Sequence, residues 1–116
     1  MKKNIRKFES GATRDVDQNK NDYEGFLSPL VIEAFGDYMT LHRVQSDGKL
    51  RDSDNWQKGM PLSAYMKSLW RHFLDLWKIH RGHEVKDKKD GHIITAKEAC
   101  CAIIFNTMGY LHESLK

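Results

Sequence analysis

The chain has 116 residues and a mass of 13.5 kDa, which is the size of one domain. Its longest uninterrupted apolar run covers seven residues, 99–105, whereas a membrane-spanning helix needs about 20. No apolar stretch follows the basic opening of the chain, so we expect no secretory signal. These features predict a single domain over residues 1–116 in the cytoplasm, with no membrane partner.

The net charge of +3 arises at the N-terminus, where Lys2, Lys3, Arg6 and Lys7 precede any acidic residue. The rest of the chain carries 15 basic and 16 acidic residues and is therefore balanced. A balanced body lacks the electrostatic field that nucleic-acid binding usually requires, so we expect no nucleic-acid partner. The two cysteines are adjacent, at 100–101, and side chains at adjacent helix positions point about 100° apart, which excludes a disulfide framework.

The N-terminal quarter, residues 1–27, is polar and predicts an arm held by a few apolar anchors. Ser28 and Pro29 then form a helix start, with a capping hydroxyl followed by proline at the first helical position. Apolar residues recur at helical spacing from there to about residue 43. The connection over 44–60 is longer than most unstructured loops, which indicates a functional or disordered segment.

Two further helices follow, over about 61–81 and 95–115. The apolar arc of the second covers about half its circumference, which favours a central helix or a subunit interface. The third opens on Thr95 and Glu98, which match a capping box. We therefore predict an all-α helical bundle that is oligomeric, with three main helices in a core over 28–116. A short fourth helix in the arm or long loop, and a short strand at 92–95, are open alternatives.

Carboxylates lie at the margin of the apolar face of each predicted helix. Glu33 and Asp37 are four residues apart on the first helix, and His72 and Asp75 are three apart on the second. Glu98 lies in the first turn of the third. Carboxylates that converge in a bundle suit Mg²⁺ or Mn²⁺, which prefer oxygen ligands, so we predict a metal site formed by these five residues. Of these, Glu33, Asp75 and Glu98 are the candidate catalytic residues.

Basic, amide and aromatic side chains could bind a phosphorylated substrate. A metal orients phosphates and activates water, and cationic side chains would balance the remaining phosphate charge. The candidate substrate-binding residues are Arg14, Lys20, Asn55, Trp56, Lys58, Arg71 and Asn106.

Structural roles compete with several of these assignments. Glu33 and Asp37 could be a solvated helix edge, Glu98 could cap its own helix, and Asn106 could be a hydrogen-bonded core residue. Trp56 could cover the core rather than stack on a base. The histidines at 80, 83 and 92 do not indicate zinc, because no paired cysteine spacing completes a site.

Several segments together resemble the phage and bacterial dATP/dGTP diphosphohydrolase family, which includes the MazZ-type enzymes of phages. The segments are FESGATRD at 8–15, Lys20, DYEGFLSP at 22–29, NWQKG at 55–59, Arg71-His72 and FNTMGYLHE at 105–113. They extend over nearly the whole chain, and their combination is more specific than any single piece.

The resemblance implies a MazG-like all-α nucleoside triphosphate pyrophosphohydrolase that is oligomeric and depends on Mg²⁺ or Mn²⁺. It further implies cleavage of dGTP or dATP to the monophosphate and pyrophosphate, with a role in some phages in supplying dGMP for 2-aminoadenine nucleotide synthesis. The wider MazG pattern has ExxE on one helix and ExxD on the next. This chain instead has Glu33 and Asp37, then His72 and Asp75, then Glu98.

Two other functions remain open from the sequence. A non-enzymatic helical phage adaptor would use the wide aromatic arc of the second helix, with Trp70 and Trp77, to hold a protein partner. A metal phosphohydrolase that releases intact triphosphate and a nucleoside is the second, although the chain lacks an adjacent His-Asp pair. We expect a purine deoxynucleoside triphosphate as the small-molecule partner and a homodimer or homotetramer as the assembly.

Overall fold

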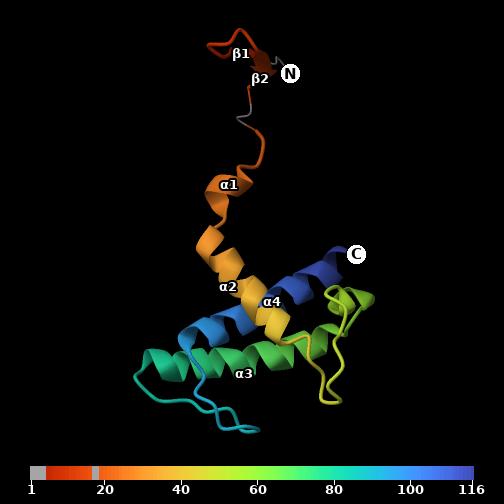
Figure 1. The fold of residues 1–116 in the computed structure, drawn as a ribbon, viewed down its shortest axis with the longest axis vertical. Coiled ribbons are helices and arrows are strands. Elements are labelled where there is room, and N and C mark those ends of the chain that lie inside the picture. The colour runs from red at the N-terminus through yellow and green to blue at the C-terminus, as the bar shows by residue number, and fades with distance from the viewer. Residues whose placement is uncertain (1–4, 17–18) are drawn as a thin grey trace.

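The computed structural model describes residues 5–16 and 19–116, and Figure 1 shows their arrangement. Lys2 and Lys3 of the basic opening lie outside the described residues. The elements in chain order are β1 (Ile5–Lys7), β2 (Thr13–Asp15), α1 (Tyr23–Phe26), α2 (Pro29–Leu41), the 3₁₀ helix η1 (Asn55–Lys58), α3 (Leu62–His80) and α4 (Ala96–Leu115).

The prediction of an all-α fold is wrong, because a two-stranded antiparallel sheet precedes the helices. Strand β1 pairs with β2 in a register that places Arg6 opposite Arg14. The turn between them closes with a hydrogen bond from the Phe8 amide to the Ala12 carbonyl, and Gly11 adopts a φ of 89° that L side chains rarely adopt. The described residues therefore form a small mixed fold of four α-helices and one hairpin.

The three main predicted helices are confirmed within two residues at most ends. The Ser28 hydroxyl accepts a hydrogen bond from the Val31 amide, with Pro29 at the first helical position, as the sequence predicted for α2. The Thr95 hydroxyl accepts from the Glu98 amide at the start of α4. The long connection after α2 contains η1 and a β-bridge between Val44 and Leu50.

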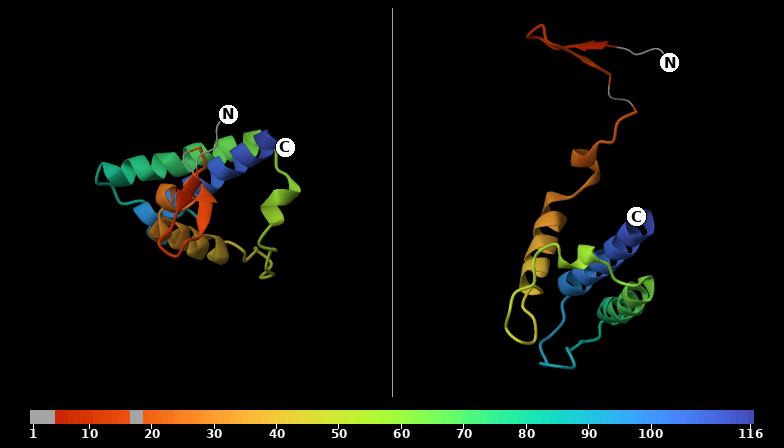
Figure 2. Two further views of the ribbon diagram at one scale, coloured as in Figure 1. Left: turned by 90° about the horizontal axis from the view of Figure 1, so that it is seen from above. Right: turned by 90° about the vertical axis from the view of Figure 1, so that its right-hand side faces the viewer.

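Helices α3 and α4 lie side by side and form the main packing unit, with α2 crossing α4 through its C-terminal half (Figures 1 and 2). Among the described residues the buried apolar side chains are few, and Tyr65 is the largest of them. Opposite Tyr65, α4 carries Gly109, and a Cβ built there would collide with the Tyr65 ring. Gly109 therefore allows the two helices to approach closely.

None of the helices in the described part of the chain combines the length and apolar content needed to cross a bilayer. The N-terminal hairpin and α1 extend away from the helical body, and the molecule measures 60 × 35 × 26 Å (Figure 2). This extended shape leaves much apolar surface uncovered.

Two helical glycines provide a matched test of the α3–α4 contact. Gly109→Ala should lower the free energy of unfolding by about 1–2 kcal/mol, since overpacking against Tyr65 outweighs a helix-propensity gain of about 1 kcal/mol. Gly36→Ala, where nothing lies within 4 Å of the new Cβ, should raise it by about 0.5–1 kcal/mol. Urea unfolding followed by circular dichroism measures both, and equal stabilisation by the two changes would contradict the close approach.

Candidate functional site

Two cavities share a wall formed by the C-terminal half of α2. The larger, about 550 Å³, lies between the end of α2, the connection that follows it and α4. The smaller, about 330 Å³, lies between α2, the start of α4 and the loop before α4. Tyr38 and His42 line both cavities, and their rings lie 4.0 Å apart. The His42 Nδ1–H donates to the Tyr38 carbonyl at 2.8 Å, which fixes the ring on the shared wall.

Aromatic rings and guanidinium groups line the larger cavity. Trp56 on η1 contacts Phe105 edge-to-face with ring centroids 6.2 Å apart. Arg43 donates from Nε to the Arg51 carbonyl at 2.8 Å, and Arg51 donates from Nη1 to the His42 carbonyl at 2.9 Å. These bonds join the end of α2 to residue 51 of the connection that follows it. They also place two positive charges beside the aromatic rings. Such a lining suits a ligand with a flat ring and negative charge.

The smaller cavity is lined by carboxylates from two different helices, Asp37 on α2 and Glu98 on α4. The Glu98 amide is capped by Thr95, while its carboxylate accepts a hydrogen bond from His92 Nε2 at 2.9 Å. His92 Nδ1 lies 2.5 Å from the Asp90 carboxylate, so both ring nitrogens face acidic oxygens. The Glu98 side chain thus faces the loop and the cavity.

The charge of Glu98 contributes to the pKa shifts of groups on two other helices. Burial, followed by the charge of Glu98, raises the pKa of Tyr38 on α2 to about 12. Burial lowers the pKa of His72 on α3, against the opposing effects of Asp75 and Glu98. The charge of Glu98 therefore acts on groups of both α2 and α3.

The structure brings some of the predicted metal ligands together more closely than others. Asp37 and Glu98 line one cavity. His72 and Asp75 are half-buried on α3, and His72 is within electrostatic range of Glu98. Glu33 is exposed and lies one turn before Asp37 on α2. The carboxylates therefore converge around Asp37 and Glu98 rather than around Glu33.

The predicted substrate-binding residues fall into three places. Asn55 and Trp56 line the larger cavity. Lys58 and Arg71 are exposed, at the end of η1 and on α3. Asn106 is buried and donates from Nδ2 to the Ala102 carbonyl at 2.8 Å, which is the bonding of a core residue.

Arg14 and Lys20 are exposed in the N-terminal extension, on β2 and in the segment after it. The views in Figures 1 and 2 agree that this hairpin lies far from the helical body. Neither residue lines a cavity of its own chain among those described.

Sequence reasoning missed several residues that line the two cavities. Tyr38 is one of the apolar residues that recur at helical spacing up to about residue 43, and His42 lies at the end of α2, where no pattern marks it. Arg43 and Arg51 are joined by hydrogen bonds to each other's segment of the chain, and no sequence pattern indicates these bonds. His92 is not among the predicted site residues, although its position near Asp90 in a polar loop is a local signal of an acid–imidazole contact.

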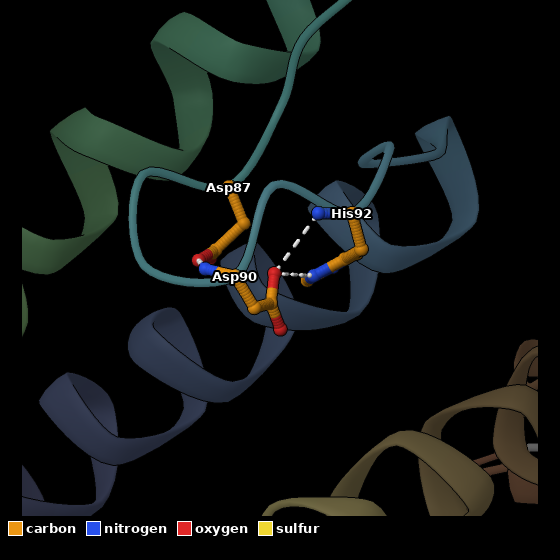
Figure 3. Close-up of side chains that lie close together, drawn as sticks. All are labelled: Asp87, Asp90 and His92. Atoms are coloured by element: carbon orange, nitrogen blue, oxygen red, sulfur yellow. Dashed lines mark hydrogen bonds and ion pairs between the residues drawn. The ribbon is translucent and has the colours of Figure 1, made fainter.

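Asp87, Asp90 and His92 form a second group that could hold a cation, as Figure 3 shows. One ligand atom from each lies within 4.8 Å of the others. The Asp87 carboxylate already accepts from the amides of Lys89 and Asp90, at 2.8 and 3.2 Å. The Asp90 carboxylate accepts from the His92 amide at 3.0 Å. These bonds stabilise the loop without a cation, so the group is explained by its own turn.

In comparisons with protein-family models, curated proteins and solved structures, none matches this chain.

The contacts of His92 give a pH-dependent prediction for the metal-free protein. Hydrogen bonds that the His92 ring donates to the carboxylates of Glu98 and then Asp90 raise the pKa of His92 to about 9, above its usual 6.5. Its stabilising contribution is therefore complete below about pH 6.5 and is lost as the pH rises through about 9. NMR titration should give a midpoint near 9 in the native chain and a lower midpoint in Glu98→Gln. Glu84→Gln, an exposed control, should leave it unchanged, and a native midpoint near 6.5 would contradict the contact.

Proposed function

We propose that this protein is a divalent-metal-dependent pyrophosphohydrolase that converts dGTP or dATP to the monophosphate and pyrophosphate. The single observation that carries this proposal is the shared wall of Tyr38 and His42. It joins an aromatic, arginine-lined cavity to one lined by the carboxylates of Asp37 and Glu98. The larger cavity has a volume within the roughly 300–1,000 Å³ that small-molecule sites occupy.

The larger cavity would receive the nucleoside portion of the substrate. The rings of Trp56 and Phe105 offer apolar faces and edges to a purine, and Asn55 offers an amide that can pair with its polar edge. Arg43 and Arg51 would balance triphosphate charge from the side of the connection. Lys58 and Arg71 remain candidates for outer phosphate contacts.

The smaller cavity would hold Mg²⁺ or Mn²⁺. Its two carboxylates come from separate helices and supply the oxygen ligands that these ions prefer, so the residues present fit the ion. Asp37 and Glu98 are the ligands we favour, with Glu33, His72 and Asp75 as the remaining candidates. When bound, the ion would neutralise phosphate charge and promote attack by water.

The proposed reaction would use the charges on the two walls. Water would attack the α-phosphorus, so that an oxygen–phosphorus bond forms and the bond to the bridging oxygen of the β-phosphate breaks. Pyrophosphate leaves, and the proton of the attacking water passes to solvent. Glu98 and Asp37 would hold the cation, while Arg43 and Arg51 would oppose the charge of the leaving group.

The choice of purine deoxynucleotides comes from the resemblance of segments such as 8–15 and 105–113 to the dATP/dGTP diphosphohydrolase family. That resemblance also supports a role in supplying dGMP for 2-aminoadenine nucleotide synthesis in a phage. A cytoplasmic location, in the host cell if the chain is phage-encoded, belongs to the same proposal.

The exposed aromatic side chains of α3 favour a second candidate, a protein-interaction adaptor. Trp70 and Trp77 are both more than half exposed, which an adaptor would use to hold a partner helix. Incubation with each dNTP and Mn²⁺ separates the two functions. Monophosphate and pyrophosphate support the pyrophosphohydrolase, triphosphate and nucleoside indicate a different hydrolase, and unchanged nucleotides favour the adaptor.

A conservative variant tests the role of Glu98 in catalysis. Glu98→Gln keeps the shape of the side chain and the Thr95 cap but removes the negative charge, so kcat for dGTP should fall by about 100-fold or more. Chromatographic separation of dGTP and dGMP measures it. The matched control Glu84→Gln, an exposed carboxylate in the loop after α3, should keep its activity. Full activity of Glu98→Gln with an unchanged fold would remove Glu98 from the mechanism.

A further inference from the structure

His42, the residue that ends α2, lies where the two cavities of the candidate site meet. It lines the larger cavity together with Trp56 and Phe105. It also lines the smaller cavity together with Asp37 and Glu98. In the proposed function the nucleoside occupies the larger cavity, and the smaller one holds the cation that the phosphates meet. The α-phosphate joins the nucleoside to the two outer phosphates, so it would lie at the wall that the cavities share.

The hydrogen bond of the His42 ring decides which of its nitrogens carries the proton. Nδ1 lies 2.8 Å from the backbone carbonyl oxygen of Tyr38, and a carbonyl oxygen can only accept. Nδ1 therefore carries the hydrogen, which leaves a lone pair on Nε2 of the neutral ring. Within the part of the chain that the structure describes, no donor is hydrogen-bonded to Nε2. The ring thus offers one unoccupied basic nitrogen.

Contacts on both sides of His42 fix the orientation of its ring. The rings of Tyr38 and His42 lie 4.0 Å apart with an interplanar angle of 31°. Arg51 donates from Nη1 to the His42 carbonyl at 2.9 Å, which also holds the backbone of the residue. An imidazole whose second nitrogen is oriented by another group is the usual arrangement of a base that activates a nucleophile.

Negative charge lies within reach of an imidazolium at this position. His42 is the C-cap of α2, and the C-terminus of a helix carries a partial negative charge that favours cations. The carboxylates of Asp37 and Glu98 line the same cavity and act in the same direction. Arg43 and Arg51 act against them from the larger cavity, where phosphate charge would neutralise both. The site can therefore stabilise the charge that proton transfer creates on the ring.

We propose that His42 is a catalytic residue of this site and accepts the proton of the attacking water through Nε2. This inference rests on the proposed function. The water oxygen forms its bond to the α-phosphorus while one water O–H bond breaks and the proton moves to Nε2. The bond from the α-phosphorus to the bridging oxygen breaks, and its electron pair leaves with pyrophosphate. The imidazolium then releases its proton to solvent, so the ring is unchanged after each turnover.

A purely structural role of His42 would use only the other nitrogen. The Nδ1–H bond to the Tyr38 carbonyl satisfies an acceptor in the last turn of α2, which is a form of C-capping. Asparagine at position 42 keeps an amide donor near the place of Nδ1 and has no atom at Nε2. Glutamine puts an amide near the place of Nε2, but an amide is not a base. The two variants therefore separate capping from proton transfer.

Steady-state kinetics with dGTP and Mg²⁺ test the transfer of the proton. His42→Asn and His42→Gln should each lower kcat by about 100-fold or more while KM stays within about threefold, since the base acts in the chemical step. Imidazole added to His42→Ala should raise its kcat by about tenfold or more in a saturable manner, because a free base can occupy the vacated place. His83→Asn, at an exposed histidine in the loop after α3, should keep the native kcat. Native activity in His42→Asn, or no response to imidazole, would overturn the proposal.

NMR of the metal-free chain tests the assignment of the base without any hydrolysis. Nitrogen chemical shifts of the His42 ring should show Nδ1 protonated and Nε2 bare at about pH 8, where an ordinary imidazole is neutral. A ring protonated at Nε2 instead would overturn the role of His42 and leave the proposed hydrolase in place. A native chain that leaves every dNTP intact would overturn both, so the two failures are distinguishable.

Discussion

The contact between Tyr65 and Gly109 is the constraint on which the rest of the helical body depends. Since Gly109 has no side chain, α3 and α4 approach closely enough to enclose the Tyr65 ring, which is only 2% exposed. That approach sets the position of α4, whose first turn carries Glu98. Helix α2 crosses α4 and places Tyr38 beside Glu98. The position of the candidate site at the start of α4 thus depends on the contact at Gly109, near the other end of the same helix.

The main helices could be predicted because their signals are local. Ser28 with Pro29, and Thr95 with the amide of Glu98, are capping arrangements that four residues specify. The β-hairpin could not be predicted in this way. Its strands have three residues each and are mostly exposed, so no alternation of apolar and polar residues marks them. The turn at Gly11 is the one local sign of it.

The candidate site was predictable only in part, and the reason is geometric. Helical spacing indicates which residues share a face, so the carboxylates at the helix margins could be found, including Asp37 and Glu98. Spacing does not say how far along each helix the crossing falls. The crossing lies at the C-terminal end of α2, which brings Asp37 rather than Glu33 into the cavity with Glu98. Loop partners such as His92 depend on a turn that no helical pattern describes.

The central claim is that acidic groups from separate helices jointly bind a divalent ion beside a nucleotide cavity. A crystal structure with Mn²⁺ and a non-hydrolysable dGTP analogue tests it most directly, because anomalous scattering locates the metal. We expect a manganese peak bonded to Glu98 and Asp37, with the purine in the larger cavity against Trp56 and Phe105. Manganese found only at the Asp87, Asp90 and His92 loop, or an analogue absent from the larger cavity, would contradict it.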